Sequence, residues 1–180
     1  MVNFITAVIL ILFAVFSRLM PHPMNFVPIA AIALFSGAYL NKKYAMLIPI
    51  AAMLISDAFI GFYSYMAWVY GSFILIAFVG FWLKKRFDGA GAGKKTGYIA
   101  ATTIVSSVLF FIITNFGVWT SGMYYDMSVS GLIQCYTMAI PFFRNSLAAD
   151  VIYAAVMFTV YELIVKYVKN PQLQESRIRK

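Results

Sequence analysis

Charged residues are scarce in this chain of 180 residues, where they make up 11% of the sequence while hydrophobic residues make up 63%. A water-soluble domain usually carries about 25% charged residues, and one of this size cannot bury so much apolar surface. The scarcity of charge therefore excludes a water-soluble globule and indicates a membrane protein.

Cysteine and histidine occur once each, as Cys135 and His22. One cysteine excludes an internal disulfide, and one histidine cannot build a metal site of several imidazole ligands. We therefore predict no cofactor and no metal. A lone cysteine in an apolar segment usually behaves as a small buried side chain, but we keep Cys135 as a candidate ligand-facing thiol.

The chain also lacks a nucleotide-binding loop. The stretch RFDGAGAGKKTGY is rich in glycine, but the phosphate-binding pattern needs a glycine where Asp88 stands and a serine or threonine where Lys95 stands. We predict a flexible linker between two three-helix halves instead. No helix face carries a serine–histidine pair or paired aspartates, so we expect no enzyme.

Six apolar segments are candidates to cross ~30 Å of hydrocarbon. They cover residues 3–20, 27–41, 44–62, 66–83, 96–118 and 146–168. The first ends in FSRLMPHP without a cleavage site, so we expect a first span and not a removable signal. The sequence predicts an all-α, polytopic membrane protein with one domain over 1–170 and a polar, basic tail over 171–180.

Basic residues are distributed unevenly over the segments between the predicted spans. Twelve of the fourteen fall on one side, namely Lys42, Lys43, Lys84, Lys85, Arg86, Lys94, Lys95, Lys166, Lys169, Arg177, Arg179 and Lys180. Short basic loops stay in the cytoplasm, so we predict six spans in the cell (inner) membrane with both termini cytoplasmic. The net charge of +8 then reflects topology and gives no reason to expect nucleic acid. The same clusters suit contacts with anionic lipid head groups.

Aromatic and polar residues gather on the predicted outer face. The connection of about 27 residues over 119–145 is longer than a simple link, and such loops usually bind ligands or act as lids. Its aromatics include Trp119, Tyr124 and Tyr136. They have an alternative explanation as an interfacial belt, whereas Asn115 and Asn145 are better candidates for ligand contacts.

Asp57 and Asp150 are the carboxylates predicted nearest the hydrocarbon, where a charge is costly and needs a partner. Arg18 and Arg144 are the cations on the same face. One alternative is that ion pairs lock the helices to the loops. The other is that Arg144 binds a polar or anionic ligand group together with the start of the last helix, which Asn145 or a neighbouring serine would cap.

The segment MPHPMNF follows the first span and holds the only histidine. Prolines restrict this backbone to turn and extended conformations, and Pro28 is suited to the first turn of the second helix. We predict a lid that holds His22 and Asn25 over a pocket. The alternative is a tight turn whose histidine faces water.

Three stretches, PIAAIALFSGAYL, IPIAAMLISDAFIGFY and FFIITNFGVW, resemble the substrate-binding S-components of energy-coupling factor (ECF) vitamin transporters. MPHPMNFVPIAAIALFSGAYL, TNFGVW and CYTMAIPFFRNSLAAD are similar to an uncharacterised family of S-component-like membrane proteins. The resemblance covers about residues 10–165. It implies a six-helix bundle whose pocket opens outward beneath three connections, with a transmembrane coupling protein and two ATPases on the cytoplasmic side.

The first span departs from that family, because many S-components dock their coupling protein through an A-x-x-x-A pattern there. In this chain the spacing occurs in the second span, at Ala33 and Gly37. Docking through the second span is one interpretation, and ordinary bundle packing is the other.

The sequence therefore predicts a membrane subunit that binds a vitamin-like small molecule for uptake. The alternative is a membrane scaffold or a subunit of another membrane complex. The candidate substrate-binding residues are His22, Asn25, Asp57, Asn115, Trp119, Tyr124, Cys135, Tyr136, Arg144, Asn145 and Asp150.

Overall fold

The structure is a computed structural model that describes residues 2–169 and shows six α-helices and no strand within them. The predicted all-α class is confirmed, and the predicted basic tail over 171–180 lies outside the described residues. The helices are α1 (Val2–Leu19), α2 (Ile29–Tyr39), α3 (Lys42–Ile60), α4 (Met66–Phe87), α5 (Ala92–Thr120) and α6 (Val129–Lys169).

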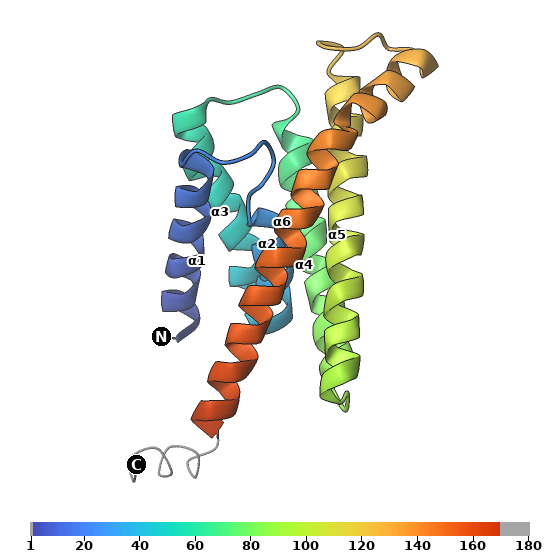
Figure 1. The fold of residues 1–180 in the computed structure, drawn as a ribbon. Coiled ribbons are helices and arrows are strands. Elements are labelled where there is room, and N and C mark those ends of the chain that lie inside the picture. The colour runs from blue at the N-terminus through green and yellow to red at the C-terminus, as the bar shows by residue number, and fades with distance from the viewer. Residues whose placement is uncertain (1, 170–180) are drawn as a thin grey trace.

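The helices run alternately up and down in one bundle (Figure 1). The α2–α3 and α4–α5 connections lie at the same end of the bundle as the start of α1 and the end of α6. We call this the basic end, because Lys42, Lys43, Lys84, Lys85, Arg86, Lys94, Lys95 and Lys166 lie in or beside these segments. The other three connections lie toward the opposite end, as the alternation of the predicted spans requires.

Local sequence signals set the helix ends at the basic end. Asn41 caps α3, since its side-chain oxygen accepts a hydrogen bond of 3.1 Å from the backbone N–H of Tyr44. The last turn of α4 carries three basic residues, which the negative end of a helix dipole favours. The glycine-rich linker is shorter than predicted, because both flanking helices extend into it and leave only residues 88–91 outside them.

Four helices are long and apolar enough to cross a membrane: α3, α4, α5 and the Val129–Lys166 part of α6. The remaining two are shorter apolar helices. With 11 residues, α2 is about 16 Å long, which is roughly half of a ~30 Å hydrocarbon core. The predicted second span over 27–41 is thus a half-length helix.

Helix α2 occupies the centre of the bundle, and Figure 1 shows it surrounded by other helices. Its residues from Ile29 through Ala38 are all buried, and it contacts each of the other five helices. A helix that is apolar on every side is stable only when it is enclosed. The sequence IAAIALFSGAY therefore places α2 inside the protein.

Two glycines allow α2 and α4 to cross in close contact. A β-carbon added at Gly37 would overlap the carbonyl oxygen of Ala77, and one added at Gly80 would overlap the carbonyl oxygen of Leu34. Ala33 is also fully buried. The interpretation of Ala33 and Gly37 as a docking surface is therefore wrong, because this face packs inside the bundle.

Helix α6 begins at Val129 and not at residue 146, so the predicted loop over 119–145 is mostly helical. The connection between α5 and α6 covers only residues 121–128. Pro141 lies within α6, where it removes one backbone hydrogen bond and kinks a helix without ending it. Figure 1 shows α6 changing direction in its early part. Asn145 and Ser146 lie inside the helix and cannot cap its start.

The close contact between α2 and α4 predicts how Gly80→Ala changes the stability of the protein. A methyl group there has no room, so we expect the substitution to lower the free energy of unfolding by about 1–3 kcal/mol. Gly71→Ala in the same helix meets open space, and we expect it to be neutral or stabilising by up to about 1 kcal/mol. Thermal unfolding in detergent compares the two, and equal effects would contradict the close crossing.

Candidate ligand pocket

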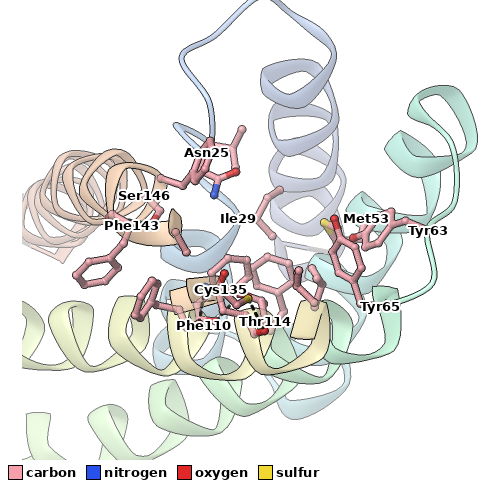
Figure 2. Close-up of a pocket in the computed structure, with 18 of the residues that line it drawn as sticks. Asn25, Ile29, Met53, Tyr63, Tyr65, Phe110, Thr114, Cys135, Phe143 and Ser146 are labelled. Carbon is pink, nitrogen blue, oxygen red and sulfur yellow. Dashed lines mark hydrogen bonds between the residues drawn. The ribbon is translucent and has the colours of Figure 1, made fainter. Parts of the chain in front are cut away.

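A cavity of about 660 Å³ lies in the half of the bundle away from the basic end (Figure 2). All six helices and the three connections at that end contribute to its walls. The lining residues are Arg18, His22, Asn25, Val27, Ile29, Met53, Ile60, Tyr63, Tyr65, Val69, Phe73, Phe110, Phe111, Thr114, Asn115, Val118, Tyr125, Cys135, Met138, Ala139, Phe142, Phe143 and Ser146.

Phenylalanines form one wall of the cavity. The rings of Phe73 and Phe110 stack with centroids 5.0 Å apart, and those of Phe111 and Phe143 are 4.8 Å apart. Aromatic walls bury flat apolar groups well and restrict their orientation. This wall is therefore suited to a planar part of a small molecule.

Tyrosines contribute polar tips elsewhere on the wall. Tyr63 and Tyr65 belong to the α3–α4 connection, and their ring centroids are 4.7 Å apart. Burial raises the pKa of the Tyr63 phenol, and the negative charge of nearby Asp57 raises it further. Tyr63 therefore stays protonated at neutral pH and keeps an O–H group that can donate a hydrogen bond.

The segment between α1 and α2 contributes His22 and Asn25 to the cavity, as the lid hypothesis predicted. Asn25 has a positive φ of 61°, a conformation that asparagine adopts more readily than most residues. The side-chain amide of Asn145 donates a hydrogen bond of 3.0 Å to the carbonyl oxygen of Met24. This bond fastens the segment to α6 at the cavity. Both His22 and Asn25 are solvent-exposed.

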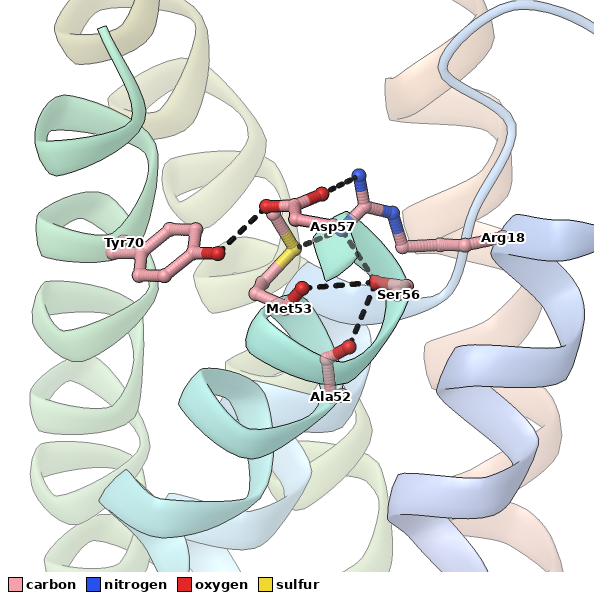
Figure 3. Close-up of polar contacts among 6 residues, drawn as sticks. All are labelled: Arg18, Ala52, Met53, Ser56, Asp57 and Tyr70. Carbon is pink, nitrogen blue, oxygen red and sulfur yellow. Dashed lines mark hydrogen bonds and ion pairs between the residues drawn. The ribbon is translucent and has the colours of Figure 1, made fainter. Parts of the chain in front are cut away.

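The fully buried Asp57 forms an ion pair with the partly buried Arg18, which belongs to the cavity wall (Figure 3). Arg18 Nη2 lies 2.7 Å from Asp57 Oδ1, and Arg18 Nη1 donates to Ser56 Oγ at 2.8 Å. Tyr70 donates its O–H to Asp57 Oδ2 at 2.6 Å. Asp57 is fully buried and does not line the cavity, whereas Arg18 does. The ion-pair alternative for Asp57 is therefore confirmed, and it links α1, α3 and α4.

The side chain of Asp150 lies beside the start of α2 and does not line the cavity. It is buried in the middle of α6, where Oδ2 accepts a hydrogen bond of 2.7 Å from Ser107 Oγ, and its carboxyl group faces the backbone N–H of Ala31 in the first turn of α2. Pro28, at the N-cap position of α2, provides no side-chain cap. Because the first N–H groups of a helix lack partners within it, Asp150 caps α2 from a neighbouring helix, where the helix dipole also favours a negative charge.

Arg144 does not pair with Asp150, so the ion-pair alternative does not hold for these two residues. Six residues along one helix rotate the side chain to a direction about 120° away, and the two residues face different surroundings. The side chain of Arg144 is exposed, and within residues 4–166, whose side chains are described, it has no hydrogen-bond or ion-pair partner. It does not line the cavity either.

Three predicted aromatics lie in the α5–α6 region outside the cavity. Trp119 Nε1 donates to the carbonyl oxygen of Asp126 at 3.0 Å, and the O–H of Tyr136 donates to the carbonyl oxygen of Ile112 at 2.6 Å. These two residues hold α5 to the α5–α6 connection and to the start of α6. Tyr124 is exposed in the short connection.

Asn115 and Cys135 do line the cavity, where α5 and α6 meet. Asn115 donates its side-chain amide to the carbonyl oxygen of Phe111 at 2.7 Å. The Cys135 thiol lies 3.4 Å from the backbone carbonyl oxygen of Asn115. Each side chain is thus held at the wall, and their contact with a ligand remains a prediction.

Several lining residues were absent from the sequence-based candidates. Of these, Phe110, Phe111, Thr114 and Val118 share one face of α5 with the predicted Asn115. That periodicity was available in the sequence, but choosing this face over the others requires the positions of the neighbouring helices. Ser146 was missed as a cavity residue because it was taken for a helix cap.

The fold and cavity define an all-helical protein with four helices able to span a membrane and a ligand-sized pocket toward one end. The chain belongs to the family described as "Family of unknown function (DUF6580)", which matches residues 1–173. Neither a comparison with curated proteins nor one with solved structures found a match.

The ion pair yields a test of stability. Asp57→Ala leaves the partly buried Arg18 guanidinium without its anionic partner, so we expect a loss of up to about 3 kcal/mol in unfolding free energy. Replacing both residues, as Arg18→Met with Asp57→Leu, should recover most of that loss. Arg144→Ala is the control, with an expected change within about 0.5 kcal/mol. Unfolding in detergent measures all three, and a large effect of Arg144→Ala would contradict the assignment of partners.

If Asp150 caps α2, removing its side chain should make the start of α2 open more often. Asp150→Ala leaves the N–H of Ala31 without an acceptor, at a cost of about 1–3 kcal/mol, whereas the Ser107 hydroxyl can still donate to the carbonyl oxygen of Thr103. We therefore expect faster amide hydrogen exchange in peptides covering the start of α2. Thr137→Ala, which removes a hydrogen bond to the carbonyl oxygen of Ile133 within α6, is the control. If α2 exchanges equally in the two variants, Asp150 is not its cap.

Proposed function

We propose that this chain is the substrate-binding membrane subunit of a small-molecule uptake transporter, similar to an ECF S-component. The cavity of about 660 Å³ carries this proposal. Ligand pockets commonly measure about 300–1,000 Å³ and combine apolar walls with a few fixed polar groups. Here, phenylalanines form much of the wall, and tyrosine, threonine, asparagine and serine side chains provide the polar groups.

The proposed topology has six crossings of the cell membrane, with both termini in the cytoplasm. It is supported by the gathering of lysines and Arg86 at the basic end, which the positive-inside rule assigns to the cytoplasm. In this topology α2 spans about half of the membrane, and the non-helical segment before it spans the other half. Non-helical backbone at membrane depth is tolerated where protein or a cavity surrounds it. The pocket then faces outward.

The charges around the pocket indicate the class of ligand. Among the described residues that line the pocket, Arg18 is the only one with a permanent charge, and Asp57 neutralises it. A ligand with a strong net charge would therefore lack a free counter-charge. We propose a vitamin-like molecule with a flat ring and no large net charge, which the phenylalanine wall and polar groups would hold.

Transport would require partners at the basic end, since the sequence carries no phosphate-binding loop. In this proposal a transmembrane coupling protein and ATPase subunits contact the cytoplasmic side. If the pocket binds no small molecule, the alternative of a scaffold or a subunit of another membrane complex is favoured.

The topology is tested with two introduced cysteines in a Cys135→Ser background. Gly91→Cys lies in the α4–α5 connection, and Met123→Cys lies in the α5–α6 connection, where Met123 is exposed. A membrane-impermeant thiol reagent should label Cys at 123 in intact cells and Cys at 91 only after the cells are opened. Labelling at 91 in intact cells would rule out the proposed orientation.

Ligand binding is tested on purified protein with a panel of vitamins, using thermal shift followed by titration. We expect one compound to bind saturably, and Ala139→Phe, which fills the cavity from α6, to weaken its binding by about tenfold or more. Ala148→Phe is the matched control, because Ala148 is exposed on the same helix and does not line the cavity. Equal affinity in both variants would place the ligand elsewhere, and no saturable binding would favour the scaffold alternative.

A further inference from the structure

A second hollow lies between α5 and α6, toward the basic end and apart from the pocket. It is a groove of about 690 Å³. Figure 1 shows α5 and α6 separating toward this end. Its walls come from the first part of α5, the last part of α6 and Ala90 of the α4–α5 connection.

The length of the groove matches one leaflet of a bilayer. Along α5 its lining extends from Ala92 to Ile104, and along α6 from Lys166 to Val151. At 1.5 Å per residue these stretches are about 18 and 22 Å long, compared with roughly 15 Å for half of the hydrocarbon core. Between the charged end and Ile104 the walls are apolar or carry small threonines, and alanines leave the space open.

Charge is confined to the basic end of the groove. Two lysines, Lys95 and Lys166, and one glutamate, Glu162, line that end and leave one net positive charge. Glu162 already accepts a hydrogen bond of 2.6 Å from the O–H of Tyr39. The lysines lie where the head groups of the adjacent leaflet would be, and the positive end of the α5 dipole adds to their effect.

We propose that this groove binds one anionic phospholipid from the leaflet at the basic end. An acyl chain lies between α5 and α6, and the phosphate lies between Lys95 and Lys166. Charge complementarity selects this occupant, because a single phosphodiester matches the one net positive charge, whereas an apolar helix from a partner protein would leave both lysines without a counter-charge. This inference requires only that the helices span a membrane, so it does not depend on the proposed pocket ligand.

The test uses the full chain in mild detergent with added phosphatidylglycerol or phosphatidylcholine, and counts retained lipids by native mass spectrometry. We expect one tightly retained phosphatidylglycerol per chain. Lys95→Gln and Lys166→Gln should each reduce its preference over phosphatidylcholine by about fivefold, as one juxtamembrane lysine does elsewhere.

Filling the groove tests the acyl-chain site separately from the charges. Ala100→Phe and Ala155→Phe, both at exposed positions in the lining, should release the retained lipid. Ala101→Phe is the matched control, because Ala101 is exposed on α5 and does not line the groove. Equal retention of the two lipids by the wild type, or retention unchanged in Ala155→Phe, would overturn the proposal. A partner helix cross-linked in the groove would also overturn it.

Discussion

Helix α2 can lie at the centre of an apolar bundle only if the unpaired N–H groups of its first turn find an acceptor there. Asp150 provides that acceptor from the middle of α6, and Ser107 of α5 donates to the same carboxylate. One buried carboxyl group thus connects three helices. The arrangement also explains how a carboxyl group without a cationic partner is accommodated so deep in the protein: the Ser107 hydroxyl and the first-turn N–H groups of α2 satisfy its oxygens.

The position of α2 also creates the cavity. With its 11 residues, the helix fills only about half of the length that a full crossing would occupy. Ile29, at its first turn, lines the cavity floor, and residues 20–28 approach it without filling the remaining space. The close crossing at Gly37 and Gly80 holds α2 at this depth. A longer or less tightly packed second helix would occupy the space where we propose that the ligand binds.

Hydropathy predicted the all-α class and the approximate position of every helix, because long apolar segments allow few alternatives. It placed the start of α6 wrongly, since Pro141 and the polar residues before it are typical of a loop as well as of a kinked helix. Among the site residues, the sequence placed His22 and Cys135 at the cavity correctly. It could not show that Asp150 faces α2, because the direction of one side chain in a helix depends on the helices packed around it.

Helix α6 joins the two hollows of the protein in a single element of 41 residues. Its early part carries Cys135 and Ala139 at the cavity, and its later part carries Glu162 and Lys166 at the groove. Pro141 lies between these two parts. The bend at this proline sets the angle between the segment of α6 beside the cavity and the segment beside the groove, so one turn of the helix fixes how the two hollows are oriented relative to each other.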